Sequence, residues 1–152
     1  MKLETGAKAP GFSLKSSSGA DISLADFSGQ KVVVYFYPKA DTPGCTKQTC
    51  LLNDSLEELK QLDTQVIGIS PDNEDKQKKF ADKYNIAFPL LCDEAHAVAD
   101  LYGVWGEKKM YGKSYMGIIR SAFMIDEKGD IVESWYKISP ADTVNKVLKA
   151  LK

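Results

Sequence analysis

The sequence has almost no net charge and no long apolar run. Its 152 residues include 20 Lys and Arg against 21 Asp and Glu, for a formal net charge of −1. A balance this close does not point to a nucleic-acid or membrane partner. The longest apolar run, residues 32–37, is far too short to span a bilayer. The first twelve residues lack the apolar segment of a secretory signal, so the expected location is the cytoplasm.

Cysteine and histidine are scarce as well, with three Cys and one His. In a cytoplasmic protein, so few cysteines are more often reactive or simply buried than joined in a structural disulfide framework. One histidine adds little to a cysteine-based metal site. A chain of this length can bury a hydrophobic core without such supports. We therefore expect a single domain over residues 1–152 that holds no metal and no cofactor.

Strand-like and helix-like segments alternate along the chain. Residues 31–37 (KVVVYFY) form a β-branched and aromatic run typical of a strand covered on both faces. Further strands are expected at 65–70, 120–125 and 131–136, the last two as a hairpin around 127–130, and helices at 43–62, 74–84, 95–102 and from Ser139-Pro140 onward. The pattern predicts an α/β sandwich with a central mixed β-sheet flanked by helices.

Cys45 lies where a helix is expected to begin. Thr42 suits the N-cap and Pro43 the first helical position, which places Cys45 in the first turn. The unpaired N–H groups and the positive end of the helix dipole favour a thiolate there. At about 100° per residue, Leu52 and Leu56 fall on the same side of the helix as Cys45. The thiol therefore faces the core side, and a small buried hydrophobe is the alternative interpretation.

Cys50 stands five residues after Cys45, which is an unfavourable spacing for a disulfide in a helix. The two side chains are about 140° apart around the axis, and their Cα atoms are roughly 8 to 9 Å apart. A disulfide needs a Cα separation below about 7 Å with converging side chains. The two thiols therefore cannot join unless the start of the helix unwinds.

Arg120 is the only arginine in the chain, against nineteen lysines. It stands in GIIRSAFMID, among apolar or small residues, whereas the lysines occupy polar stretches. A permanently charged guanidinium held at a site of low dielectric favours an anion, and a thiolate is such an anion. The alternative is an arginine at a strand edge that reaches solvent.

The stretch YFYPKADTPGCTKQTC, residues 35–50, resembles the active site of a known family. Pro38-x-x-x-Thr42-x-x-Cys45 after an apolar strand is similar to the peroxiredoxin motif, and a second cysteine five residues later is typical of the Q type, the bacterioferritin comigratory proteins. The resemblance extends through residues 102–126 and covers nearly the whole chain. It implies a thioredoxin-like fold with peroxiredoxin additions, and a thiol peroxidase activity toward hydrogen peroxide and organic hydroperoxides.

The resemblance also implies a role for each residue of the motif. Cys45 is expected to be the peroxidatic thiolate, which attacks a peroxide oxygen and becomes a sulfenic acid. Thr42 is expected to hydrogen-bond the thiolate and the peroxide, although a capping role competes for the same oxygen. Pro38 is expected to shield the thiolate from water. Arg120 is expected to stabilise the thiolate and the charge that develops on the departing oxygen.

The second half of the implied cycle involves Cys50. Its thiol is expected to condense with the sulfenic acid, and a thioredoxin-like protein is expected to reduce the resulting disulfide. Gly44 and Gln48 are supporting residues of the motif. Gln48 stands where many relatives carry a glutamate, and a neutral amide leaves more of the charge on Arg120.

Several alternatives remain open on the sequence alone. Cys92 is expected to be a buried residue at a strand end, with a second resolving thiol as the alternative. Trp105, Tyr111 and Tyr115 are expected to pack, with a pocket rim as the alternative. Two other functions are alternatives to a peroxidase. A thioredoxin-like disulfide oxidoreductase would use a C-x-x-C pair, and a redox sensor would react with peroxide but show little turnover. A monomer is expected, with a weak dimer not excluded.

Overall fold

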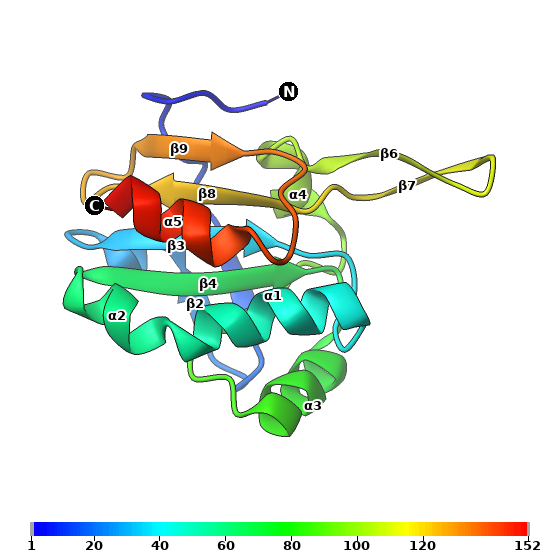
Figure 1. Cartoon of the computed structure of the whole chain (residues 1–152), viewed down its shortest axis with the longest axis horizontal. Coiled ribbons are helices and arrows are strands. Elements are labelled where there is room, and N and C mark those ends of the chain that lie inside the picture. The colour runs from blue at the N-terminus through cyan, green and yellow to red at the C-terminus, as the bar shows by residue number, and fades with distance from the viewer. Residues whose placement is uncertain (1, 152) are drawn as a thin grey trace.

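The computed structural model describes residues 2–151, and within them a seven-stranded sheet carries helices on both faces (Figure 1). The strands of this sheet are β1 (Ser13–Ser16), β2 (Asp21–Ser23), β3 (Lys31–Phe36), β4 (Thr64–Ser70), β5 (Leu90–Cys92), β8 (Ser121–Ile125) and β9 (Ile131–Trp135). The helices are α1 (Pro43–Asp54), α2 (Leu56–Gln61), α3 (Glu74–Tyr84), α4 (Ala97–Leu101) and α5 (Thr143–Leu151). A separate hairpin consists of β6 (Trp105–Met110) and β7 (Lys113–Ile118).

The sheet is mixed, as the sequence predicts. Its strand order is β2-β1-β5-β4-β3-β8-β9, and β3, β4 and β5 run parallel. The pairs of β8 with β3 and with β9 are antiparallel, and β1 pairs antiparallel with both β2 and β5. The expected hairpin of residues 120–125 and 131–136 is therefore confirmed, with strands at Ser121–Ile125 and Ile131–Trp135.

Strand β3 divides the core into two layers, because alternate side chains of a strand point to opposite faces. Val33 and Tyr35 join the layer beneath α1, α2, α3 and α5, which also contains Cys45. Val34 and Phe36 join the layer on the other face, together with residues of α4. All six residues that follow Lys31 are buried, which confirms a strand covered on both faces.

The helix expected over 43–62 is in fact two helices, α1 and α2, with Ser55 between them. Asn53 fixes the end of α1 by a hydrogen bond from its amide to the Asn85 carbonyl and by accepting the Ala87 N–H. Asn, Asp and Ser in succession have polar side chains that compete with helical hydrogen bonds. Leu56 and Leu59 remain buried beneath the sheet on α2.

Two other helices begin later than the sequence suggests. α4 starts at Ala97 rather than Ala95, because the Asp93 carboxylate accepts the N–H groups of Val98 and Ala99. α5 starts at Thr143 rather than at Ser139-Pro140. Ser139 instead caps a turn, since its hydroxyl accepts the Asp142 N–H at 3.2 Å.

The β6–β7 hairpin has no counterpart among the expected strands, and it projects from the body of the molecule (Figure 1). Trp105 at its base is half-buried and stacks on His96 with ring centroids 3.8 Å apart. Tyr111 at its tip is 98% exposed, so the expectation that this residue packs is wrong. No helix within residues 2–151 has both the length and the apolar character needed to cross a membrane.

Candidate active site

Cys45 occupies the first turn of α1, as expected from the sequence. Thr42 is the N-cap residue, and its carbonyl accepts the Thr46 N–H at 2.8 Å. The N–H groups of Gly44 and Cys45 precede this first helical bond, so they have no acceptor within the helix. Cys45 is only 1% exposed and belongs to the core layer between α1 and the sheet.

Arg120 reaches the thiol from the segment between β7 and β8. Its Nη2 donates to Cys45 Sγ at 3.3 Å, and its Nη1 donates to Gln48 Oε1 at 2.7 Å. The Arg120 carbonyl accepts the Ile138 N–H at 2.9 Å, which fixes the backbone behind the side chain. The guanidinium therefore points inward, contrary to the alternative of an edge arginine in solvent, and its charge stabilises a negative charge on Sγ.

Gln48 links this guanidinium to α5. Its Nε2 donates to Thr143 Oγ1 at 2.9 Å, and the Thr143 hydroxyl in turn donates to the Ser139 carbonyl at 2.9 Å. Both side chains are completely buried. A neutral amide suits this position, because it accepts from Arg120 on one side and donates to Thr143 on the other.

Gly44 gives Arg120 room to approach the helix. A Cβ at Gly44 would lie 3.2 Å from Arg120 Nη2 and 3.5 Å from Pro140 Cγ. The first of these is tighter than an ordinary contact, so a larger residue here would displace the guanidinium. The supporting position expected for Gly44 thus has a steric basis.

The loop from Pro38 to Thr42 connects β3 to α1 beside the thiol. Pro38 and Thr42 are both half-buried. The Thr42 hydroxyl donates to the Lys39 carbonyl at 2.8 Å, and it makes no capping bond to the helix. The expected competition from a capping role is therefore absent, and the lone pairs of Thr42 Oγ1 remain available as acceptors.

Contacts from other elements hold this loop in place. The Ala40 N–H donates to Asp72 Oδ2 at 2.7 Å. Asp41 adopts a left-handed conformation with φ of 61°, and its carboxylate accepts from Lys83 at 3.0 Å and from the Tyr84 hydroxyl at 2.9 Å. The hydrogen bonds from Lys83 and then Tyr84 lower the pKa of Asp41.

The other two cysteines are free thiols away from the guanidinium. Cys50 is half-buried on the intact helix α1, and burial, followed by the charge of Asp54, raises its pKa. Cys92 is the last residue of β5 and is 8% exposed, which confirms the expected burial at a strand end. Burial raises the pKa of Cys92 to about 11.

Two polar residues of α1 were missed by the sequence analysis as anchors of the helix. Thr49 is completely buried, and its hydroxyl hydrogen-bonds Tyr35 Oη of β3 at 2.8 Å. Gln48 likewise anchors α1 to another element, through the hydrogen bond that its amide donates to Thr143. A rotation of about 100° per residue places both side chains within about 60° of Cys45, so the helical periodicity indicated their burial. Their partners could not be identified without the fold.

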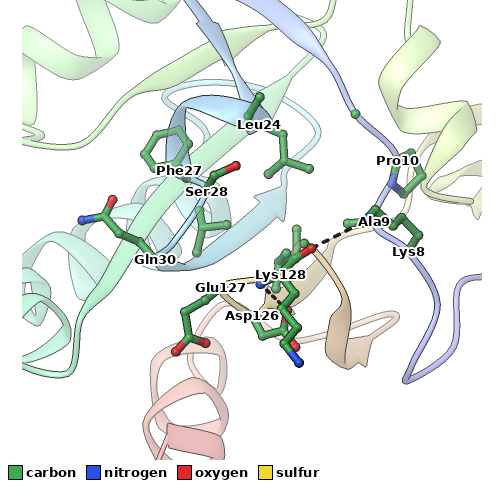
Figure 2. Close-up of a pocket in the computed structure, with 15 residues that line it drawn as sticks. Lys8, Ala9, Pro10, Leu24, Phe27, Ser28, Gln30, Asp126, Glu127 and Lys128 are labelled. Atoms are coloured by element: carbon green, nitrogen blue, oxygen red, sulfur yellow. Dashed lines mark hydrogen bonds between the residues drawn. The ribbon is translucent and has the colours of Figure 1, made fainter.

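A cavity of about 550 Å³ lies at the opposite end of β3 from Cys45. Figure 2 shows it between the segment around Leu24 and Phe27, the turn at Asp126–Lys128 and the residues near Ala9. It adjoins Gln30, where β3 is about to begin, whereas Cys45 follows the end of β3. The cavity is therefore not part of the thiol site.

Comparisons with known proteins agree with the fold and with the motif. Residues 5–134 match the model of the AhpC/TSA family. Peroxiredoxin Bcp of Bacillus subtilis is 45% identical over 152 residues, with 100% of this chain and 97% of the relative covered. Peroxiredoxin Bcp of Escherichia coli is 47% identical over 150 residues, with coverage of 99% and 96%.

A solved structure of the Xanthomonas campestris bacterioferritin comigratory protein superposes with a TM-score of 0.90 at 33% identity, and 97% of each chain is covered. This agreement confirms the thioredoxin-like fold with peroxiredoxin additions. The chain therefore belongs to the AhpC/TSA family, and within it to the peroxiredoxins of the Q type, or bacterioferritin comigratory proteins.

Proposed function

We propose that Cys45 is the peroxidatic thiolate of a thiol-dependent peroxidase. The peroxidase activity follows from membership of the peroxiredoxin family. The observation that supports Cys45 as the reacting group is its 3.3 Å hydrogen bond from Arg120 Nη2 at the first turn of α1. Neither of the other two thiols is bonded to a cation in this way within residues 2–151.

The first step is attack of the Cys45 sulfur on one peroxide oxygen. The S–O bond forms as the O–O bond breaks, so the sulfur becomes a sulfenic acid and the second oxygen departs with the electron pair. Arg120 and the N–H groups of the first turn stabilise the charge that moves from sulfur to oxygen. The Thr42 oxygen accepts the peroxide hydroxyl proton in a hydrogen bond, and Pro38 shields the sulfur from water.

The second step is condensation of the sulfenic acid with Cys50. Both cysteines lie on the intact helix α1, five positions apart, where the Cα separation is roughly 8 to 9 Å. A disulfide requires less than about 7 Å. Residues around 43 to 50 must therefore unwind first, and the disulfide then holds the unwound form. A thioredoxin-like protein restores the dithiol by exchange.

The proposed substrates are hydrogen peroxide and organic hydroperoxides. The Xanthomonas campestris relative is described by its alkyl peroxide reduction activity, which supports the inclusion of organic hydroperoxides here. The protein is proposed to be a cytoplasmic monomer, and its formal net charge of −1 gives no reason to expect a nucleic-acid or membrane partner. Residues 1–152 then act as one domain without a cofactor.

Rapid-mixing consumption of peroxide, with and without a thioredoxin recycling system, tests these assignments. Wild type is expected to turn over many times with recycling, and Cys45→Ser to consume no peroxide. Cys50→Ser is expected to stop after one equivalent, whereas Cys92→Ser behaves as wild type. Unchanged consumption by Cys45→Ser would refute the peroxidatic role. Sustained turnover by Cys50→Ser would make Cys92 the resolving thiol.

A further inference from the structure

Two glycines face each other near the base of the β6–β7 hairpin. Gly106 pairs with Gly117, and neither has a side chain to fill that face. A Cβ at Gly106 would lie 2.8 Å from Ile119 Cδ1, and a Cβ at Gly117 would lie 3.2 Å from Lys108 Cδ. The space left by the two glycines is therefore occupied by Ile119 and by the stem of Lys108.

The Lys108 side chain runs toward the base of the hairpin. Lys108 pairs with Tyr115, yet its Cδ lies over Gly117, which is two residues closer to the end of β7. Beyond Gly117, the chain continues through Ile119 to Arg120. The lysine stem thus runs toward the end of the hairpin from which Arg120 reaches Cys45, whereas the exposed neighbour Lys109 lies on the other side of the ribbon.

The electrostatic environment of Lys108 agrees with this direction. Lys108 is half-buried, and its pKa is lowered first by burial and then by the charge of Arg120, while Cys45 acts in the opposite sense. The salt bridges found within residues 2–151 do not include Lys108. Within the described residues its ammonium therefore interacts with a second cation and forms no salt bridge with a carboxylate, and Cys45 is the group whose interaction offsets part of this cost.

We propose that Lys108 is the proton donor to the oxygen that leaves when Cys45 attacks a hydroperoxide, an inference that rests on the proposed function. The Cys45 sulfur bonds to the hydroxyl-bearing oxygen of ROOH, the O–O bond breaks, and RO⁻ departs with the electron pair. Lys108 Nζ gives a proton to RO⁻, which leaves as ROH, or as water from hydrogen peroxide. Sulfur is oxidised, the peroxide is reduced, and the neutral amine regains its proton from water.

Arg120 cannot supply this proton, because a guanidinium stays protonated in proteins. A lysine at a half-buried site beside another cation is better suited, since its proton is more readily released. The groups whose charge acts on Lys108 are Arg120 and Cys45, and the titratable phenol of Tyr115 belongs to its partner residue across the ribbon. The two cations therefore have different roles, since Arg120 stabilises negative charge on the reacting atoms and Lys108 donates a proton to the leaving oxygen.

The test compares Lys108→Met and Lys108→Arg with Lys109→Met, an exposed control on the other face of the same strand. The second-order rate of Cys45 oxidation is measured by rapid mixing with hydrogen peroxide and with tert-butyl hydroperoxide, from pH 6 to pH 10. General acid catalysis contributes about 100-fold or more, so Lys108→Met should react about 100-fold more slowly at pH 7. Lys108→Arg should be nearly as slow, because it keeps the charge but releases no proton.

The pH profile gives a second readout. Wild type should lose rate at alkaline pH as Lys108 loses its proton, and Lys108→Met should lack that decline. Tyr115→Phe should retain it, which separates the lysine from the phenol. Gly117→Ala keeps Lys108 but displaces its stem, and should lower the rate with an unchanged thermal midpoint.

Three results would overturn the inference. Equal rates for Lys108→Met and Lys109→Met would remove any role for Lys108 in the reaction. A wild-type rate for Lys108→Arg would assign its effect to charge rather than to proton transfer. An alkaline decline that persists in Lys108→Met would exclude Lys108 as its source. Failure of wild type itself to consume peroxide, judged against Cys45→Ser, would refute the proposed function instead.

Discussion

Replacement of Tyr35 by Phe should accelerate formation of the disulfide between Cys45 and Cys50. Thr49 lies between the two cysteines on α1, and its hydroxyl shares a 2.8 Å hydrogen bond with Tyr35 Oη. Both residues are completely buried, so water does not substitute for either partner. The bond exists only while the helix is wound, and its loss therefore favours the unwound form in which the thiols can meet.

The size of the effect follows from the strength of one neutral hydrogen bond. Such a bond contributes about 1 kcal/mol net to stability, and about 1.4 kcal/mol corresponds to a tenfold change in an equilibrium. The unwound fraction, and with it the resolution rate, should rise about fivefold. The freed Thr49 hydroxyl can bond a carbonyl of the preceding helical turn, which prevents a larger effect. The phenylalanine ring retains the stacking on Tyr37 at 5.5 Å.

Rapid mixing with one equivalent of peroxide measures this rate, because the sulfenic acid can be trapped by dimedone only until Cys50 reacts. Amide exchange over residues 45–50 of the reduced protein measures the unwound fraction independently. Tyr37→Phe is the matched control, since it removes a buried 2.6 Å bond to Gln77 of α3 rather than to α1. Equal acceleration in both variants, or none in Tyr35→Phe, would refute the role of Thr49 as an anchor.

Three further perturbations test other contacts. Gly44→Ala should slow Cys45 oxidation several-fold, because the added Cβ would lie 3.2 Å from Arg120 Nη2. The thermal midpoint should not fall, because alanine favours a helix more than glycine does. An unchanged oxidation rate would contradict the role given to Gly44. Asp41→Asn should lower the thermal midpoint slightly at pH 7. Folding lowers the pKa of Asp41 from 3.8, so the extra stability of wild type is fully present above that pH and should shrink as the pH falls below it. A difference in thermal midpoint between wild type and Asp41→Asn that does not change with pH would exclude the ion pair as its cause. Iodoacetamide at pH 8 should label Cys92 last in the native protein, because a pKa of about 11 leaves it about 0.1% thiolate, and rapid labelling would disprove its burial.

The helix start and the strand before it could be predicted because their signals are local. Thr42 and Pro43 have the conformational preferences of an N-cap and a first helical residue, whatever the rest of the chain does. Residues 31–37 are so apolar that only a strand covered on both faces accommodates them. The approach of Arg120 to Cys45, 75 positions apart, was expected from the rarity of arginine and the resemblance to a family, since no local rule brings them together.

The contacts around this pair depend on the tertiary fold and could not be predicted. Gln48 binds Thr143, which is 95 positions away on a helix whose start was placed four residues too early. The β6–β7 hairpin was missed because its turn, Tyr111-Gly112, is not the Asn-Gly or Asp-Gly pair typical of tight hairpins, although both residues have positive φ. Without this hairpin, the position of Lys108 could not be predicted either.

The single arginine of this chain has a practical consequence for spectroscopy. Because Arg120 is the only arginine among 152 residues, protein grown with isotopically labelled arginine contains one labelled guanidinium, and that group hydrogen-bonds the Cys45 sulfur. Nitrogen NMR of such a sample gives one set of side-chain resonances. Each chemical state of the sulfur is then visible through one neighbouring probe, with no mutation and no attached dye.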